Sequence, residues 1–406
     1  MSKNSVENQA GTSAANGVAG MARRSHLASA LVAGVAWAVP LRAWPQGTSK
    51  VPGISSDAIV LAHFGPLSGI LAPANKEALS GAQYFFSKLN ASGGIHGRRV
   101  ELLIEDDTQD PKVNATMLKK VIDEGSAFAM FMYRTTPAID AAIPLISDAQ
   151  MPFLAPQVGP NSLYEPFNRH IFPVRARYRD EAVDLLRHLN TLQHKRIGFV
   201  YASDAFGKDV KVGIDAEMQR LNLKPSFEAQ VDNRNPDVQP AVATIMEAKA
   251  PAVVLVTGFK PASDIIKAAR GQGGVMQFLT LSNNSSEVLV KALGDQARNV
   301  GVTQVIPSPS ARGARFGRDF SAAVAASQGK LINSYASAQG YLSAMVVTEG
   351  FRRTGKALTR ESFLRAMESM EKANFWGHEV RYSPSSRQGS RFTELTMIDR
   401  HGRFIR

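Results

Sequence analysis

The stretch "SGGIHGRRVELLIEDDTQDP" (residues 92–111) runs from a glycine-rich turn through a short apolar segment to a cluster of carboxylates that ends in Asp-Pro. The apolar segment predicts a strand, and the helical periodicity of the residues after it predicts a helix. Asp110 then stands at the N-cap of that helix with Pro111 at its first position, and Asp106 and Asp107 lie in the loop near its positive end. Acids after a strand also suit a Mg²⁺ site, but no phosphate-binding loop or second carboxylate cluster accompanies these. We interpret the acids as cap and loop residues, and we expect neither a metal nor a cofactor.

Short apolar runs alternate with amphipathic segments along residues 57–306 in two successive series, the second of which begins near residue 171. Such alternation is typical of βα units and parallel sheets. After Pro307 the pattern is mainly helical, and two strand-like segments follow at 378–383 and 393–399. A chain of 406 residues suits two domains better than one core. We therefore expect an α/β protein made of two doubly wound βα lobes, with its ligand outside the carboxyl ends of the strands.

The composition excludes several classes of function. There are no cysteines, which rules out disulfides, thiolate metal sites and cysteine nucleophiles. The formal net charge is +12, but the basic residues are scattered, so we expect a solvated basic surface and no nucleic-acid partner. The sequence contains no dinucleotide-binding or Walker glycine motif, no G-x-S-x-G and no H-E-x-x-H, and its eight histidines lie singly. We expect that the protein is not an enzyme.

The N-terminal residues predict export. Residues 1–20 are polar and small, and we expect them to be disordered or to reflect a mis-assigned start, because Met21 stands where a conventional signal peptide would begin. Residues 21–43 read as a signal peptide, with an arginine pair before an apolar core at 27–39 that is short for a membrane span. The motif "RRSHL" permits Tat export, with Sec as the other route. We expect a periplasmic protein whose mature chain begins near Trp44.

Three motifs carry a resemblance to a known family. "GPLSG" after the first strand, "GAQYFFSKLNASGGIHGRRVELLIEDDTQDP", and "YASDAFGKD" after a later strand resemble the type I periplasmic solute-binding proteins of ABC importers. The leucine/isoleucine/valine-binding proteins are the most similar branch, and the likeness spans about residues 57–400.

The family resemblance implies two lobes that the chain crosses three times and that close on a ligand by hinge motion. We place the crossings near 173–176, 305–308 and 385–391. The resulting division is lobe 1, 57–174 with 307–388, and lobe 2, 175–306 with 389–406.

The resemblance also implies where lobe 1 holds a ligand carboxylate, namely in the loops after its third and fourth strands. The matching loops are "MYRTTPA" and "APQVGPN". Thr135 and Thr136 offer hydroxyl and backbone N–H groups at a helix N-terminus, and Arg134 offers a charge-assisted bond. Plain helix capping is the alternative for the threonines, and a solvated surface position is the alternative for Arg134. Ala155 and Gln157 occupy the positions after the fourth strand.

On lobe 2 the resemblance implies aromatic residues that cover the ligand. The matching positions hold Phe206 in "SDAFGKD" and Phe259 with Lys260 in "TGFKPAS". Ordinary packing within the lobe is the alternative for Phe206. Ser68 of "GPLSG", in lobe 1, completes the expected site.

The segment "LTLSNNS" departs from the family pattern. Amino-acid-binding members place an acidic residue here to pair with the ligand's α-ammonium group, whereas this chain has Ser282 and Asn283. Because a buried ammonium needs a carboxylate partner, either another acid such as Asp204 replaces it, or the ligand has no α-amino group. We favour the second reading, with an aromatic or short aliphatic acid as ligand.

The resemblance implies an extracytoplasmic substrate-binding receptor of an ABC importer of the branched-chain amino acid type. Its ligand is a small carboxylate or an amino acid, its partner is an ABC permease at the inner membrane, and we expect a monomer. The alternative is an exported ligand-sensing module that docks on a membrane signalling protein.

Overall fold

A computed structural model describes residues 51–284 and 287–406. The described residues form one compact unit. The expected start at 1–20 and the expected signal peptide at 21–43 lie outside the described residues. No helix within the described ranges is long and apolar enough to cross a membrane.

The first sheet has five parallel strands in the order β2-β1-β3-β4-β5. These are β2 (Arg99–Asp106), β1 (Ala58–Gly65), β3 (Ala129–Phe131), β4 (Phe153–Leu154) and β5 (Ile171–Phe172). Successive side chains of a strand point to opposite faces, so Ile59 and Leu61 join one core while Ala62 and Phe64 join another. Both faces of this sheet are therefore buried, which accounts for its nearly continuous apolar strands.

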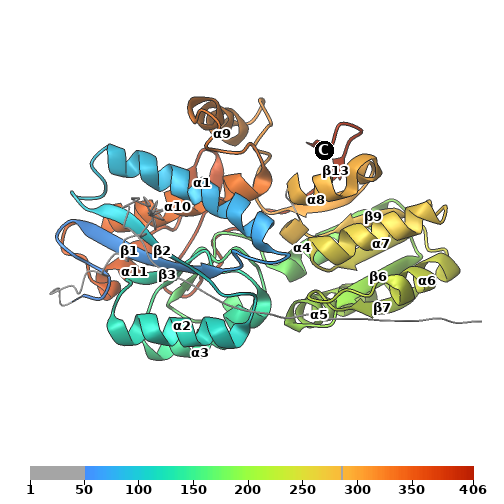
Figure 1. Cartoon of the computed structure of the whole chain (residues 1–406), viewed down its shortest axis with the longest axis horizontal. Coiled ribbons are helices and arrows are strands. Elements are labelled where there is room, and N and C mark those ends of the chain that lie inside the picture. The colour runs from blue at the N-terminus through green and yellow to red at the C-terminus, as the bar shows by residue number, and fades with distance from the viewer. Residues whose placement is uncertain (1–50, 285–286) are drawn as a thin grey trace, which may run out of the picture. The chain divides into compact units, whose positions relative to one another are not determined.

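Helices cover both faces of the first sheet. In Figure 1 the strands β1–β3 lie between α1 on one side and α2 with α3 on the other. The side of α1 also holds α10 and α11, whose apolar residues share one core with α1. The helices of this lobe are α1 (Ala72–Ala91), α2 (Pro111–Glu124), α3 (Thr136–Asp148), α9 (Arg315–Ala326), α10 (Tyr335–Thr354) and α11 (Arg360–Glu368).

The second sheet has the order β14-β13-β10-β9-β8-β6-β7. Its strands are β6 (Ile197–Ala202), β7 (Phe227–Val231), β8 (Ala252–Val256), β9 (Gln277–Thr280), β10 (Gly301–Gln304), β13 (Glu394–Ile398) and β14 (Phe404–Ile405). Strands β6–β10 are parallel and repeat the strand order of the first sheet, while β13 and β14 add an antiparallel edge. Phe199 and Val254 pack towards α4 and α5, and Val200 and Leu255 pack towards α6–α8. These helices are α4 (Tyr178–Thr191), α5 (Ala205–Arg220), α6 (Gln239–Ala248), α7 (Phe259–Gly271) and α8 (Glu287–Leu293).

The chain passes between the two sheets three times: from β5 to α4, from β10 to α9, and from the small hairpin β11 (Ala373–Phe375)–β12 (His378–Val380) to β13. The first and third passages are bonded together, because Tyr382 Oη and Gly389 N both donate to Pro173 O, at 2.9 and 3.2 Å. A Cβ on Gly389 would lie 2.3 Å from that oxygen, so only glycine fits. The predicted fold class is confirmed. The exact residue boundaries of the lobes stay a prediction.

The acids of the opening stretch have the structural roles that the sequence predicts. Asp110 caps α2 by accepting from Lys112 N at 2.8 Å, and Pro111 is the first helical residue. Asp106 accepts from Leu67 N and Thr108 N, which ties the loops after β1 and β2 together. Within the described residues there is no cluster of three or more His, Asp or Glu side chains arranged to hold a metal ion. The prediction that Asp110 caps α2 is confirmed, whereas Asp106, predicted in the loop, is the last residue of β2.

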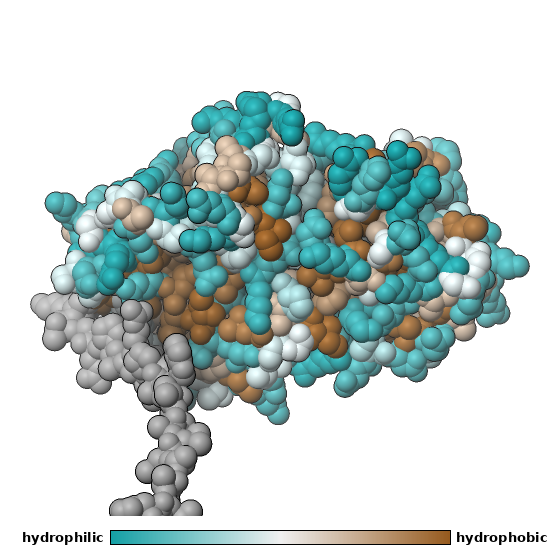
Figure 2. Space-filling model, turned by 45° about the horizontal axis from the view of Figure 1, so that its top comes forward, coloured by the Kyte–Doolittle hydropathy of each residue, from teal (hydrophilic) through white to brown (hydrophobic). Residues whose placement is uncertain are grey.

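The sequence patterns missed three short strands, β5, β11 and β14, each of which has two or three residues. Alternation cannot be recognised over so few positions, and these strands form because neighbouring strands supply their partners. The surface shown in Figure 2 is mostly hydrophilic, with apolar residues in separate small patches. The large exposed apolar side chains, among them Phe167 and Val275, are dispersed along the chain, which is ordinary for a protein surface.

Candidate functional site

A cavity of about 100 Å³ lies where the loops after the parallel strands of both sheets meet. Loops after β1, β2, β3 and β4 contribute from the first sheet, and loops after β6, β7, β8 and β9 contribute from the second. This is the position that doubly wound folds use for ligands. The lining residues are Leu71, Gln109, Arg134, Thr135, Thr136, Pro137, Val158, Tyr178, Asp204, Phe206, Asn233, Arg234, Gly258, Phe259, Asn283 and Asn284.

Arg134 brings a positive charge to the first-lobe wall of the cavity. Its side chain is half-buried, and Nη1 donates to Gln157 Oε1 at 3.0 Å. Among the described residues no carboxylate lies within ion-pair distance of this guanidinium. Burial lowers the pKa of Arg134, because the charged form is partly desolvated. A partly desolvated cation without a counter-ion at a cavity wall is suited to an anionic ligand.

The N-terminus of α3 lies beside Arg134. Thr135 has φ 73° and ψ 128°, a conformation that β-branched residues rarely adopt and that costs on the order of 1–3 kcal/mol. Thr136 is 3% exposed, and its Oγ1 has no hydrogen-bond partner. Thr135 stands at the N-cap position of α3, but neither its side chain nor that of Thr136 makes a capping hydrogen bond. The free hydroxyl and the positive helix end together offer donors to a carboxylate.

Three aromatic residues of the second lobe form the apolar part of the wall. The rings of Tyr178 and Phe206 meet edge to face at 4.9 Å between centroids, and Phe259 starts α7 nearby in the lining. Burial raises the pKa of Tyr178 to about 12. Its phenol is therefore neutral at physiological pH and can donate a hydrogen bond.

The acid Asp204 accepts three hydrogen bonds from local structure. One carboxylate oxygen caps α5 by accepting from Phe206 N and Gly207 N at 3.0 and 3.3 Å. The other oxygen accepts from Asn233 Nδ2 at 3.0 Å. Asp204 therefore lines the cavity with both oxygens already in use.

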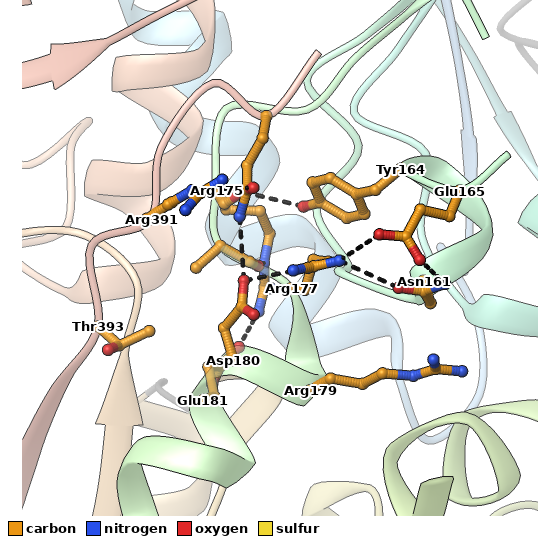
Figure 3. A network of polar contacts seen from close by, with 12 residues as sticks. Asn161, Tyr164, Glu165, Arg175, Arg177, Arg179, Asp180, Glu181, Arg391 and Thr393 are labelled. Carbon is orange, nitrogen blue, oxygen red and sulfur yellow. Dashed lines mark hydrogen bonds and ion pairs between the residues drawn. The ribbon is translucent and has the colours of Figure 1, made fainter. Parts of the chain in front are cut away.

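Ser282 belongs to a buried cluster at the first passage between the sheets, of which Figure 3 shows Arg175 and Glu181. Arg175 and Glu181 form an ion pair there, and both are almost completely buried. Ser282 donates to Glu181 Oε1 at 2.9 Å and accepts from Arg175 Nη2 at 2.7 Å, while Thr303 donates to the other Glu181 oxygen. We call these four residues the hinge cluster. The hydroxyl of Ser282 is saturated within it.

A smaller cavity adjoins the main one and shares Arg134, Val158 and Asn283 with it. Gln157 and Ser282 also line this smaller space. Gln157 Nε2 and Asn283 Oδ1 are both buried and without a partner. Unpaired polar atoms therefore face the space between the lobes from both sides.

The structure places the sequence-predicted residues in three groups. Those that line the main cavity are Arg134, Thr135, Thr136, Phe206, Phe259 and Asn283. Those that line the adjoining space are Gln157 and Ser282. Those outside both linings are Ser68, which is exposed, Ala155, which is packed in the core, and Lys260, which pairs with Asp264.

Sequence reasoning missed several lining residues, including Tyr178, Gln109, Asn233 and Arg234. Gln109, Asn233 and Arg234 follow β2 and β7, and the rule that ligands lie at the carboxyl ends of strands could have found them. Tyr178 follows a passage between the lobes instead of a strand that ends at the cavity, so that rule does not reach it.

Comparison with known proteins identifies a family and several relatives of this chain. The sequence matches the model of a family described as periplasmic binding protein over residues 58–402. An amino acid binding protein of Pseudomonas aeruginosa is 23% identical over 73% of this chain and 81% of its own length. The Leu/Ile/Val-binding protein of Escherichia coli is 22% identical over 61% of this chain and 67% of its own length. The crystal structure of a substrate-binding periplasmic protein from Ralstonia solanacearum is 27% identical, with a TM-score of 0.80 over 86% of this chain and 99% of that one.

Proposed function

Because this chain belongs to the periplasmic binding protein family, whose members bind solutes and are not enzymes, we propose that it is the extracytoplasmic receptor of an ABC importer. It closes two lobes on a small solute that carries a carboxylate and delivers that solute to a permease at the inner membrane. One observation carries this proposal. The guanidinium of Arg134, which has no ion-pair partner among the described residues, and the buried hydroxyl of Thr136, which has no hydrogen-bond partner, lie in the same cavity wall.

The geometry supports a division of labour between the lobes. In the first lobe, Arg134 and Thr136 meet the carboxylate. In the second, Phe206 and Phe259 cover the apolar body of the ligand. Closure removes water from between these walls, which strengthens the charge-assisted bonds. Ligand affinity therefore depends on the closed state, as hinge motion requires.

The names of the relatives favour an amino acid as ligand, since one is an amino acid binding protein and another a Leu/Ile/Val-binding protein. The cavity favours a different solute, because its lining holds two arginines against one acid, Asp204, which already accepts three hydrogen bonds. A small carboxylate is common to both readings.

Thermal unfolding in the presence of a panel of carboxylates and amino acids tests the proposal. A ligand at 100 times its Kd stabilises the folded protein by about 2.7 kcal/mol. Arg134→Gln should reduce this stabilisation to roughly 0.3–1.4 kcal/mol at the same ligand concentration, whereas Lys260→Gln should keep it, because Lys260 is a nearby cation outside the cavity lining. If Arg134→Gln responds as the wild type does, the carboxylate is held elsewhere.

The transport half of the proposal needs a separate measurement. Cells that lack this chain should lose uptake of the bound solute at concentrations near its Kd and recover it with the wild-type chain. Normal uptake without the chain would contradict a receptor role while leaving binding intact.

A further inference from the structure

The charge balance of the main cavity is positive. Arg134 and Arg234 lie in its wall, and neither has an ion pair within the described residues. Asp204 is the one acid among the described lining residues, and its two oxygens accept from Phe206 N, Gly207 N and Asn233 Nδ2. An ammonium group brought into this space would meet two guanidinium groups and a single carboxylate, which already accepts three hydrogen bonds. Desolvating a cation without a partner is strongly unfavourable.

The second lobe offers an uncharged acceptor instead. Asn283 Nδ2 donates to Thr257 O at 3.0 Å and to Asn284 Oδ1 at 3.3 Å. Asn284 is held in turn, because its Nδ2 donates to Thr257 O and to Thr280 Oγ1. The amide of Asn283 therefore has one allowed orientation, since a flip would set its oxygen against the carbonyl of Thr257.

Fixing the amide in this way leaves Asn283 Oδ1 as a buried acceptor without a partner. Asn283 lines both the main cavity and the adjoining space. A buried acceptor is favourably satisfied by a donor that the ligand carries. Because the cavity disfavours positive charge, that donor has to be neutral, as in a hydroxyl group.

We propose that this site selects carboxylates that also carry an uncharged hydrogen-bond donor, the hydroxy acids, and rejects the α-amino acids of the same carbon skeleton. The inference rests on the proposed function, since it assigns the solute class of that same cavity. The carboxylate lies at Arg134 and Thr136 of the first lobe, and the hydroxyl donates to Asn283 Oδ1 of the second. One ligand thereby satisfies unpaired groups on both walls and favours the closed state.

Isothermal titration of the wild-type chain with matched compounds tests the inference. One series is 4-methylpentanoate, 2-hydroxy-4-methylpentanoate and leucine. The other is 3-phenylpropanoate, its 2-hydroxy and 4-hydroxyphenyl forms, and phenylalanine. In at least one series a hydroxylated acid should bind about 3- to 10-fold more tightly than the plain acid, as one added hydrogen bond gives. The amino acid should bind more than about 100-fold more weakly than the plain acid, as expected for an unpaired buried cation.

Asn283→Leu gives the second arm of the test. This variant removes the acceptor, and Thr257 O keeps its bond from Asn284 Nδ2. The preference for the hydroxylated acid should disappear while binding of the plain acid persists. If the variant does not fold, the ranking of compounds by the wild-type chain still decides.

Each remaining outcome has a definite meaning. An amino acid that binds as tightly as its plain acid overturns the rejection of ammonium groups. Equal binding of plain and hydroxylated acids, or an unchanged preference in Asn283→Leu, overturns the role of Asn283. Absence of binding by every carboxylate and amino acid in the panel contradicts the proposed function itself, and this inference fails with it.

Discussion

The hinge cluster and the first-lobe wall of the cavity each contain a buried or half-buried arginine. The arginine of the hinge cluster has many partners within the protein, whereas the arginine of the cavity wall has few. Arg175 in the hinge cluster pairs with Glu181, donates to Ser282 and to Gln157 O, and lies over the ring of Tyr178 at 4.6 Å. Among the described residues, Arg134 in the cavity wall makes one hydrogen bond, with Gln157, and no ion pair. A saturated buried arginine stabilises the fold, and an unsaturated one at a cavity is free to meet a ligand.

The difference shows which buried polar groups are structural and which are candidates for ligand binding. Structural groups have hydrogen-bond or ion-pair partners within the protein, and candidate binding groups lack them, whatever their residue type or burial. Asp106, Asp107 and Asp110 accept hydrogen bonds from backbone N–H groups, and Asp204 accepts from backbone N–H groups at a helix N-terminus. Thr136, Gln157 and Asn283 are buried with unpaired atoms, and all three face the space between the lobes.

The largest expected effect is that of Glu181→Gln in the hinge cluster on the free energy of unfolding. Removing one charge of a buried pair leaves Arg175 uncompensated, so the free energy of unfolding should fall by about 3–5 kcal/mol. Urea denaturation measures this change. The matched control is Asp319→Asn, which breaks an exposed pair with Arg315 and should cost no more than about 1 kcal/mol. Equal effects of the two variants would show that the hinge cluster does not stabilise the fold.

The second test uses pH on another saturated group, His63. Its Nδ1 lies 3.2 Å from Phe131 O and its Nε2 lies 3.2 Å from Asn75 Nδ2, so the neutral ring donates to one and accepts from the other. Burial lowers the pKa of His63 to about 4 from the 6.5 of an ordinary histidine. A depressed histidine pKa gives stability that is present above pH 6.5 and lost as the pH falls towards 4.

The expected loss from His63 is about 1.4 kcal/mol per pH unit in that window, or roughly 3 kcal/mol in all. His378, whose pKa burial also lowers to about 4, adds in the same direction. Glu77 and Asp107 oppose it, since burial raises their pKa values. Urea denaturation at pH 7 and pH 5 measures the net effect. His63→Gln should reduce the difference between the two pH values, and an undiminished difference would assign it to other groups.

Much of the fold was predictable because its signals are local. Strand-length apolar runs such as 58–64, helical periodicity and the Asp110–Pro111 cap all depend on neighbours in the sequence. The short strands β5, β11 and β14 form only by pairing with other strands, and two or three residues are too few to show a strand pattern in the sequence.

The candidate site was predictable for a different and narrower reason. Residues directly after strands, such as Arg134 and Phe206, follow from the rule that ligands lie at strand ends and from family resemblance. The hinge cluster was not predictable, because its residues come from three segments that lie far apart in the sequence: Arg175 with Glu181, Ser282, and Thr303. The sequence does not reveal that the hydroxyl of Ser282 has hydrogen-bond partners or that the side-chain oxygen of Asn283 has none.

The third test moves to the unsaturated region, where binding should change more than stability. Arg134→Gln removes a charge-assisted bond of about 1.5–3 kcal/mol, so ligand affinity should fall roughly 10- to 150-fold. The free energy of unfolding without ligand should stay the same or rise, because a partly desolvated cation without a counter-ion is removed. Isothermal titration and urea denaturation of the same variant measure both. A loss of stability like that of Glu181→Gln would show that Arg134 stabilises the fold as the hinge cluster does. The proposed difference between the hinge cluster and the cavity wall would then be wrong.

The smallest expected effect concerns Arg234, which joins the lobes at the edge of the cavity. Its Nη2 donates to Gln109 O across the cleft, and Arg234 itself is exposed. An exposed hydrogen bond between flexible groups contributes about 1 kcal/mol or less, so Arg234→Ala should weaken binding by roughly 5-fold or less. Because this bond joins the two lobes, its loss should act on closure, and the dissociation rate of the ligand should rise while the association rate holds. Stopped-flow measurement of both rates tests this, with Arg312→Ala as a control on an exposed arginine outside the cavity lining. A fall in the association rate alone would show that Arg234 steers the anion by its charge and does not hold the lobes together.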